Sequence, residues 1–384
     1  MVGETNSGKT KVLVWGAGQM ARKFWENRVF WEDVIDIVAI TDNNSHIWEK
    51  AFNTYRIIPP QEAYRLEFDR IIISSLKYYK EIAGQIIAET NIDKSKIENI
   101  LYVAKCKLLA RYGSDIDKQD VLSYIRSHEL EVFNYPYVEK YESLQPDIGF
   151  DSDAKLYYVL HNGQRMYMAR GLDTEDKVSM YYKSLCIEQD RESPHLYLED
   201  GFDVEQNDVV VDAGAAEGIF ALSIIEKARK LYLIETDAEW IKALKYTFRN
   251  YTEKVEIINA FIADYEGYNT HKLDNLVHEE VNFIKMDIEG CEYPAMRGAK
   301  RLISESNRIR CAVCAYHNDN DEVLLEEFAK NMGMKTEFSK GFMFYCIDIQ
   351  QHYILPTLRR GIIRCTKSES SGLQKKNKQI ENLG

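Results

Sequence analysis

The chain has 384 residues, of which 45% are hydrophobic, and a formal net charge of −12. This length suits two or three domains, each with its own core. The negative charge disfavours nucleic acids and anionic membranes as partners, so we expect a small-molecule or glycan substrate. We find no apolar run that could span a bilayer and no secretory signal, and the seven Cys are scattered, so a cytoplasmic location is expected.

The segment GETNSGKT at residues 3–10 satisfies the Walker A pattern, which binds nucleotide phosphates. That chemistry needs a buried strand before the loop and a helix after it. Only two residues precede this segment, and the residues that follow, KVLVW, are typical of a strand. We therefore interpret residues 1–10 as a disordered leader rather than an ATP site.

Residues 11–105 alternate between strand and helix patterns, which predicts a small Rossmann-like α/β domain. Gly16 and Gly18 fit the dinucleotide fingerprint after the first strand, and Asp42 follows the second strand, where a ribose-binding acid belongs. The unit is about half the usual size, and no catalytic Tyr-x-x-x-Lys follows it. Three interpretations stay open: a structural or interaction domain, a nucleotide or nucleotide-sugar site, and an NAD site. The stretch YRIIPPQEAYRLEFDRIIISS resembles small Rossmann-like domains at the front of sugar-modifying enzymes such as sugar O-acyltransferases, which implies a nucleotide-sugar ligand.

Residues 106–206 are predicted to form a helical linker followed by a hairpin and cap segment. Asn162 and Gly163 lie between two alternating strands, as a type I′ hairpin turn requires. From Asp208 a second α/β series begins, with strand patterns in VVVDAG, LYLIET, VEIINAFIA, NFIKMDIE and RIRCAVCAYH. We expect a doubly wound sheet ending in an antiparallel pair over residues 335–348. The two Cys of RCAVCAY are interpreted as buried strand residues, and residues 350–384 as a largely disordered tail.

Chemistry is concentrated in this second series. Asp212, Gly214 and Gly218 lie where a buried strand turns into a helix, so that the backbone can approach a ligand. Glu235 ends the next strand and is placed to accept both ribose hydroxyls of an adenosine. Asp287 ends the fourth strand.

These residues resemble the FkbM-type methyltransferases, which have the class I S-adenosylmethionine fold. The resemblance covers about residues 205–346, and its most specific part is K-x-D-x-E-G-x-E from Lys285 to Glu292. It implies a seven-stranded doubly wound sheet within a domain at 207–349. It also implies S-adenosylmethionine as the cofactor, with Asp212, Gly214 and Gly218 at the methionine end, Glu235 at the ribose, and Asn259, Ala260 and Phe261 on the adenine side. Glu217 is a further expected cofactor contact.

Methyl transfer to oxygen needs a positioned nucleophile and a route for its proton. The catalytic candidates lie at strand ends near the cofactor edge: Lys285, Asp287, Glu289 and His317. Lys285 and Asp287 share a strand face, which favours a pair between them, although Lys285 fits a structural salt bridge equally well. Asp287, Glu289 and His317 could also ligate a divalent metal. The segment IEQDRESPHLYL is expected to contribute to an acceptor pocket through Gln189, Asp190 and His195, with Glu292 as a further substrate contact, or else to be a polar loop that caps a helix.

The leading prediction is an S-adenosylmethionine-dependent O-methyltransferase that acts on a sugar hydroxyl of a glycan, a polysaccharide precursor or a nucleotide-sugar. One alternative is an NAD(P)-dependent sugar oxidoreductase that uses Gly16, Gly18 and Asp42. Another is a non-catalytic nucleotide-sugar-binding scaffold. The acceptor, a metal requirement and a homo-oligomeric state are left open by the sequence.

Overall fold

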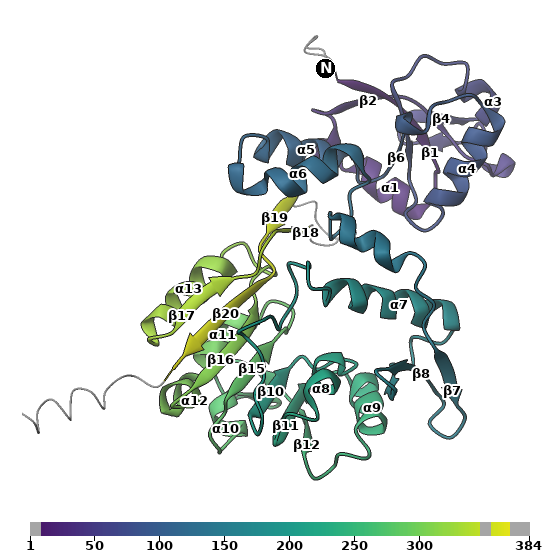
Figure 1. Ribbon diagram of the computed structural model, residues 1–384. Coiled ribbons are helices and arrows are strands. Elements are labelled where there is room, and N and C mark those ends of the chain that lie inside the picture. The colour runs from purple at the N-terminus through teal and green to yellow at the C-terminus, as the bar shows by residue number, and fades with distance from the viewer. Residues whose placement is uncertain (1–8, 346–354, 369–384) are drawn as a thin grey trace, which may run out of the picture. The chain divides into compact units, whose positions relative to one another are not determined.

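The structure is a computed structural model that describes residues 9–345 and 355–368 (Figure 1). The described residues fall into two compact units, residues 9–134 with 344–345 and 355–358, and residues 135–343 with 359–368. The predicted leader lies outside the described residues as far as residue 8, and Thr10 is already part of a strand. Within the described ranges, none of the helices has the length and apolar character that crossing a membrane requires.

The first unit contains a six-stranded sheet, which is parallel except for its short edge pair. Its buried centre is formed by the β-branched and aromatic residues of VLVW and III. In spatial order the strands are β3 (Ala51–Phe52), β4 (Tyr55–Ile58), β2 (Ile35–Thr41), β1 (Thr10–Trp15), β5 (Arg70–Ile73) and β6 (Ile97–Asn99). The helices are α1 (Gln19–Glu26), α2 (Arg28–Trp31), α3 (Pro60–Ala63), α4 (Tyr79–Glu89), α5 (Tyr102–Tyr112) and α6 (Gln119–Ser127). The predicted Rossmann-like α/β domain is confirmed.

The second unit opens with an antiparallel sheet of three strands, β7 (Ile148–Asp151), β8 (Leu156–His161) and β9 (Gln164–Tyr167). The hairpin predicted at Asn162 and Gly163 is confirmed, since both residues have the positive φ values, 51° and 78°, that this turn requires. Helix α7 (Glu175–Glu188) follows, and the side chain of Thr174 caps its first turn.

The main sheet of the second unit has seven strands and confirms the predicted class I architecture. Its spatial order is β12 (Val255–Asn259), β11 (Lys230–Glu235), β10 (Val209–Ala213), β15 (Phe283–Met286), β16 (Ile309–Cys314), β20 (Ile362–Lys367) and β17 (Lys335–Phe338). All neighbours are parallel except those of β20, which is antiparallel to both β16 and β17. Two further pairs are short: β13 (Phe261–Ile262) with β14 (Thr270–His271), and β18 (Met343–Tyr345) with β19 (Thr357–Arg359).

Helices cover both faces of this sheet (Figure 1). One core packs α7, α8 (Ile219–Ile224) and α9 (Ala238–Thr247) against residues such as Val210, Leu231 and Phe283. The opposite core uses the alternate strand residues and the helices α10 (Leu273–Leu276), α11 (Glu292–Arg297), α12 (Lys300–Glu305) and α13 (Asp321–Asn331). Burial on both faces explains why these strands are continuously hydrophobic.

Two expectations about the end of the chain need correction. The antiparallel pair expected over residues 335–348 is instead formed by β17 with β20, and β20 lies inside the sheet rather than at its edge. The segment 350–384 was expected to be largely disordered, yet Ile362 and Ile363 are fully buried in β20. The sequence pattern does not reveal this short apolar strand, because the residues around it are mostly polar. The remaining residues of that predicted tail, 350–354 and 369–384, lie outside the described residues.

We predict that Ile363→Ala lowers the free energy of unfolding by about 2–5 kcal/mol, because it leaves a cavity where β20 meets the core. Chemical denaturation of the full chain measures this. Lys335→Ala, on the exposed edge strand β17, is the control and should change stability by no more than about 0.5 kcal/mol. Equal effects of the two substitutions would contradict the central place of β20.

Candidate active site

A cavity of about 720 Å³ opens at the carboxyl ends of β10, β11 and β15. This is the edge at which ligands bind in open α/β sheets, and the volume suits a small-molecule site. Helix α7 and the loop after it supply one wall. The polar and aromatic residues that line the cavity include Tyr181, Glu188, Gln189, His195, Tyr197, Glu217, Glu235, Trp240, Tyr265, Lys285, Asp287, Glu289 and Tyr316.

The turn after β10 brings the backbone against β15. Gly214 has a φ of +74°, and a Cβ atom there would lie 1.7 Å from the carbonyl oxygen of Asp287. Only glycine fits this position. Gly214 lines the cavity, whereas Gly218, at a φ of +86°, starts α8 and packs toward Leu244 and Phe248 without lining it.

Glu235 ends β11 and holds this turn in place. Its Oε2 atom accepts a hydrogen bond from the amide of Ala216 at 3.0 Å, and its Oε1 atom accepts from Thr236 and Asp237 at 2.6 and 2.9 Å. Asp237 in turn caps α9. The carboxylate is therefore fixed beside the cavity by backbone groups alone.

Asp212 and Lys285 form an ion pair beneath the turn. The Lys285 Nζ atom lies 3.1 Å from Asp212 Oδ1 and donates to the carbonyl oxygen of Gly214 at 2.6 Å. Burial lowers the pKa of Lys285, but the carboxylates of Asp212 and Asp287 outweigh burial and raise it above its usual value. The expected Lys285–Asp287 pair is thus corrected: the direct partner of Lys285 is Asp212, its neighbour across the parallel strands.

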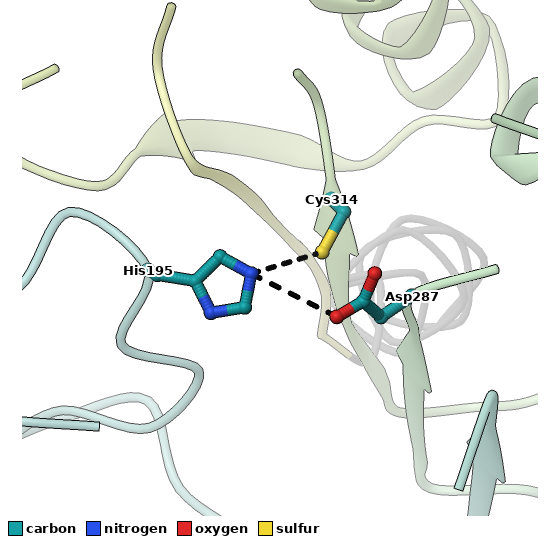
Figure 2. Close-up of side chains that lie close together, drawn as sticks. All are labelled: His195, Asp287 and Cys314. Carbon is teal, nitrogen blue, oxygen red and sulfur yellow. Dashed lines mark hydrogen bonds and ion pairs between the residues drawn. The ribbon is translucent and has the colours of Figure 1, made fainter. Parts of the chain in front are cut away.

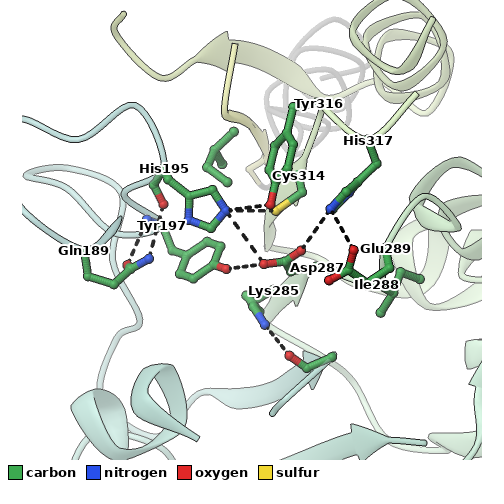
Figure 3. A network of polar contacts seen from close by, with 12 residues as sticks. Gln189, His195, Tyr197, Lys285, Asp287, Ile288, Glu289, Cys314, Tyr316 and His317 are labelled. Atoms are coloured by element: carbon green, nitrogen blue, oxygen red, sulfur yellow. Dashed lines mark hydrogen bonds and ion pairs between the residues drawn. The ribbon is translucent and has the colours of Figure 1, made fainter. Parts of the chain in front are cut away.

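Asp287 is the centre of a polar network (Figure 3). Tyr197 donates to its Oδ2 atom at 2.7 Å, and His195 Nε2 lies 3.7 Å from the same oxygen. His317 Nε2 lies 3.7 Å from the other oxygen, Oδ1. Burial raises the pKa of Asp287, but the charge of Lys285, the neighbouring imidazoles of His195 and His317 and the hydrogen bond from Tyr197 lower it to about 2. The group is ionised at neutral pH.

The loop after α7 carries His195 and Tyr197 into the cavity wall. Gln189 fixes its shape, because its amide donates to the carbonyl of His195 at 3.3 Å and accepts from the Tyr197 amide at 3.4 Å. Burial lowers the pKa of His195 to about 4, although Asp287 opposes this shift. His195 is therefore neutral at pH 7. Tyr316, two residues beyond β16, places its hydroxyl 3.2 Å from His195 Nε2.

His317 and Glu292 form a buried pair behind Asp287. His317 Nδ1 lies 2.9 Å from Glu292 Oε1, which also accepts from the Ile288 amide at 2.8 Å. Burial lowers the pKa of His317, but Glu292 and the charges of Asp287 and Glu289 outweigh it and raise the pKa. Neither His317 nor Glu292 is among the residues that line the cavity. Glu289 lines it with a side chain that is 93% exposed.

Three other predicted site residues lie away from the cavity. Asp212 is fully buried beneath it. Asp190 accepts a hydrogen bond from Tyr141 at 2.7 Å and helps to anchor the loop. Asn259 is exposed at the end of β12, whereas its neighbours Ala260 and Phe261 line the cavity.

Helix α7 adds one acidic group, Glu188, to which the sequence analysis gave no role in the site. Tyr181 donates to the buried carboxylate of Glu217 at 2.7 Å and stacks on Trp240. Glu188, the last residue of α7, lines the cavity. Burial raises its pKa to about 8, with a further contribution from Asp287 and Glu217 against the opposing charge of Lys285.

The first unit repeats the glycine-turn arrangement at Gly16 and Asp42. Gly16 has a φ of +104°, and Gly18 precedes α1. The Asp42 carboxylate accepts from the amides of Ala17 and Asn44, each at 2.8 Å. This turn therefore has the same acid-to-backbone bond as the turn held by Glu235.

A comparison with protein families finds a match for part of the second unit. Residues 203–336 match the model of the methyltransferase FkbM domain. They are an FkbM methyltransferase domain. The chain is accordingly an S-adenosylmethionine-dependent methyltransferase, as the resemblance implied. Residues 8–98 match a second model, described as C2185-like, N-terminal. A comparison with curated proteins found no match.

Among solved structures, a methyltransferase FkbM from Methylobacillus flagellatus aligns over 93% of this chain and 90% of its own, at 16% identity and a TM-score of 0.47. A putative methyltransferase from Streptococcus mutans in complex with SAH aligns over 43% of this chain and 90% of its own, at 14% identity and a TM-score of 0.29. Magnesium protoporphyrin IX methyltransferase from Synechocystis, with bound SAM, aligns over 42% and 71%, at 12% identity and a TM-score of 0.28. The assignment rests on the family match.

We predict that Lys285→Met destabilises the protein by about 3–5 kcal/mol, because it leaves the buried Asp212 carboxylate without its counter-charge. The loss should shrink as the pH falls toward 4. In the variant the folded pKa of Asp212 lies well above its unfolded value, so the folded state binds the proton more tightly and is stabilised by acid. Denaturation curves at several pH values measure this, and Asp212→Asn combined with Lys285→Met should recover much of the loss. A loss that does not change with pH would contradict the assignment.

Proposed function

We propose that the chain transfers the methyl group of S-adenosylmethionine to a hydroxyl of a sugar, carried by a glycan, a polysaccharide precursor or a nucleotide-sugar. The main support for a cofactor site is the Glu235 carboxylate, which three backbone amides hold beside the Gly214 turn and which faces the cavity. A side chain at Gly214 would collide with the carbonyl group of Asp287, so this position must be glycine and its backbone is uncovered where a ligand approaches. These features fit an adenosine ribose at Glu235 and the amino-acid end of the cofactor at the turn.

The sugar acceptor is supported by the mixture of groups on the cavity wall. Tyr181, Tyr197, Tyr265 and Tyr316 combine apolar ring faces with hydroxyl groups, and amphipathic rings suit the alternating apolar and polar surfaces of a sugar. The predicted roles of Gln189 and His195 in acceptor binding are kept, because both line the cavity. Asp190 and Glu292 are kept only as positioning residues, since one anchors the loop and the other holds His317.

When bound, S-adenosylmethionine supplies an electrophilic methyl group on a sulfonium. The chain must then orient the acceptor hydroxyl and take its proton. Lys285 is unsuited to accept it because its ammonium is held by Asp212 and Gly214. Asp287 is a weak base, whereas Glu188 lines the same cavity with a pKa of about 8. We infer that Glu188 accepts the proton and that Asp287, with Tyr197 and His195, orients the hydroxyl.

The first unit is proposed to bind a nucleotide or nucleotide-sugar. The bond from the Ala17 amide to Asp42 and the positive φ of Gly16 support this. A cytoplasmic location stays a prediction, and the oligomeric state stays open.

We expect Glu235→Ala to weaken binding of S-adenosylhomocysteine at least about tenfold, because hydrogen bonds to a charged group contribute roughly 1.5–3 kcal/mol each. Isothermal titration calorimetry measures it, with thermal unfolding as a check on folding. Glu239→Ala, exposed in the first turn of α9, is the matched control and should bind as the wild type does. Absence of binding by the wild type would overturn the cofactor site.

We expect Glu188→Gln to lower kcat by about 10²–10⁴-fold while leaving the affinity for S-adenosylhomocysteine unchanged. The wild-type rate should rise with pH up to about 8, where Glu188 loses its proton, and the variant should lack this rise. Methyl transfer to candidate sugars provides the assay. Glu175→Gln, exposed at the other end of α7, is the control. A variant with the wild-type pH profile would remove Glu188 from the proton transfer.

A further inference from the structure

Three metal-ligating side chains from distant parts of the chain meet beside the cavity (Figure 2). His195 comes from the loop after α7, Asp287 follows β15, and Cys314 ends β16. His195 Nε2 lies 3.6 Å from Cys314 Sγ and 3.7 Å from Asp287 Oδ2. One ligand atom from each of the three residues lies within 4.8 Å of those of the other two.

These separations suit a small tetrahedral cation. With Zn–N distances near 2.0–2.1 Å, Zn–O near 2.0–2.2 Å and Zn–S near 2.3 Å, a tetrahedral zinc ion holds nitrogen and sulfur ligands about 3.6 Å apart and nitrogen and oxygen ligands about 3.3–3.5 Å apart. The measured N–S separation of 3.6 Å matches, and the N–O separation of 3.7 Å is about 0.2 Å longer. Nitrogen, carboxylate and thiolate donors together are typical of zinc.

The arrangement does not suit a proton relay. In a Cys–His–Asp relay the thiol and the carboxylate contact different ring nitrogens of the histidine. Here Cys314 Sγ, Asp287 Oδ2 and the Tyr316 hydroxyl all face the same atom, His195 Nε2. A single ring nitrogen has one proton or one lone pair to share, whereas a cation attracts all of these donors toward one point.

The cysteine pair of RCAVCAY is not itself the metal motif. Cys311 belongs to the core on one face of the sheet and Cys314 to the core on the other. Their spacing of three residues places them on opposite faces of the strand. Cys314 alone therefore points toward His195, and its remaining partners must come from other elements.

The metal ligands expected from the sequence, Asp287, Glu289 and His317, form a weaker candidate site than the cluster at Cys314. Glu292 rather than Glu289 completes that cluster. Its Oε1 atom already accepts from the Ile288 amide and lies 2.9 Å from His317. That carboxylate serves to hold the turn and the histidine, while the cluster at Cys314 offers a softer donor set.

We propose that His195, Asp287 and Cys314 bind one Zn²⁺ ion at the wall of the cavity. Binding of the ion displaces the proton of the Cys314 thiol to solvent: the S–H bond breaks as the Zn–S bond forms.

His195 and Asp287 line the cavity, so the ion is within reach of an acceptor placed there. A zinc ion lowers the pKa of a hydroxyl that it contacts. In the proposed transfer it would therefore ease removal of the acceptor proton by Glu188. This role rests on the proposed function, whereas binding of the ion does not.

The test is titration of the chelator-treated full chain with Co²⁺, followed by its absorption spectrum and by displacement with Zn²⁺. We expect one equivalent of Co²⁺ to produce the intense visible bands of a tetrahedral site and a sulfur-to-cobalt charge-transfer band. Cys314→Ser should lose the sulfur band, and His195→Gln should weaken Co²⁺ binding by more than the roughly 10–100-fold that loss of an outer partner costs. Cys291→Ser, an exposed thiol that also lines the cavity, is the matched control and should keep the full spectrum.

Folding is checked by circular dichroism, and if Cys314→Ser does not fold, His195→Gln decides alone. A wild-type spectrum without tetrahedral or sulfur bands overturns the proposal, and so does a sulfur band that survives in Cys314→Ser or vanishes in Cys291→Ser. Because these measurements need neither methyl donor nor acceptor, their failure is distinct from failure of the proposed function. Calorimetry with S-adenosylhomocysteine tests that function separately.

Discussion

The buried pair of Asp212 and Lys285 is the interaction on which the site depends. Both residues sit in the middle of the sheet, where a lone charge would be costly, so each requires the other. The same ammonium holds the carbonyl of Gly214, and Gly214 rests against the backbone of Asp287. One ion pair therefore ties β10 to β15 and fixes the turn where the cavity begins.

Around this pair, backbone hydrogen bonds hold one wall of the cavity in place, and side-chain contacts hold the opposite wall. Glu235 is held by three amides, so its carboxylate is rigid at little entropic cost. The opposite wall is the loop with His195 and Tyr197, which Gln189 keeps in shape. A wall that belongs to a cap outside the sheet is free to vary between proteins that share the same sheet.

Much of the fold and of the cofactor edge could be predicted from the sequence, because parallel strands end at a common edge and glycine marks the turns. Gly214, Glu235 and Asp287 are placed by that rule alone. The partner of Lys285 could not be predicted by that rule, because it depends on the register between two strands. That register places Asp212 of β10 opposite Lys285 of β15. Strand β20 was missed because six residues in a polar segment carry too short a pattern. Tyr316 follows the end of β16, so the strand-end rule could have found it.

The cavity has more acidic than basic side chains, which bears on both the proposed cofactor and the proposed catalytic base. The ionised Asp287 lies there beside the acidic side chains of Glu188 and Glu217, and the nearby cation Lys285 is already paired with Asp212. Such an excess of carboxylates favours a cationic ligand such as the sulfonium of the proposed donor. The same excess, added to burial, raises the pKa of Glu188. In the proposed mechanism the acids that favour a cationic donor thus also make Glu188 a stronger base, so that one electrostatic arrangement would serve both cofactor binding and proton removal.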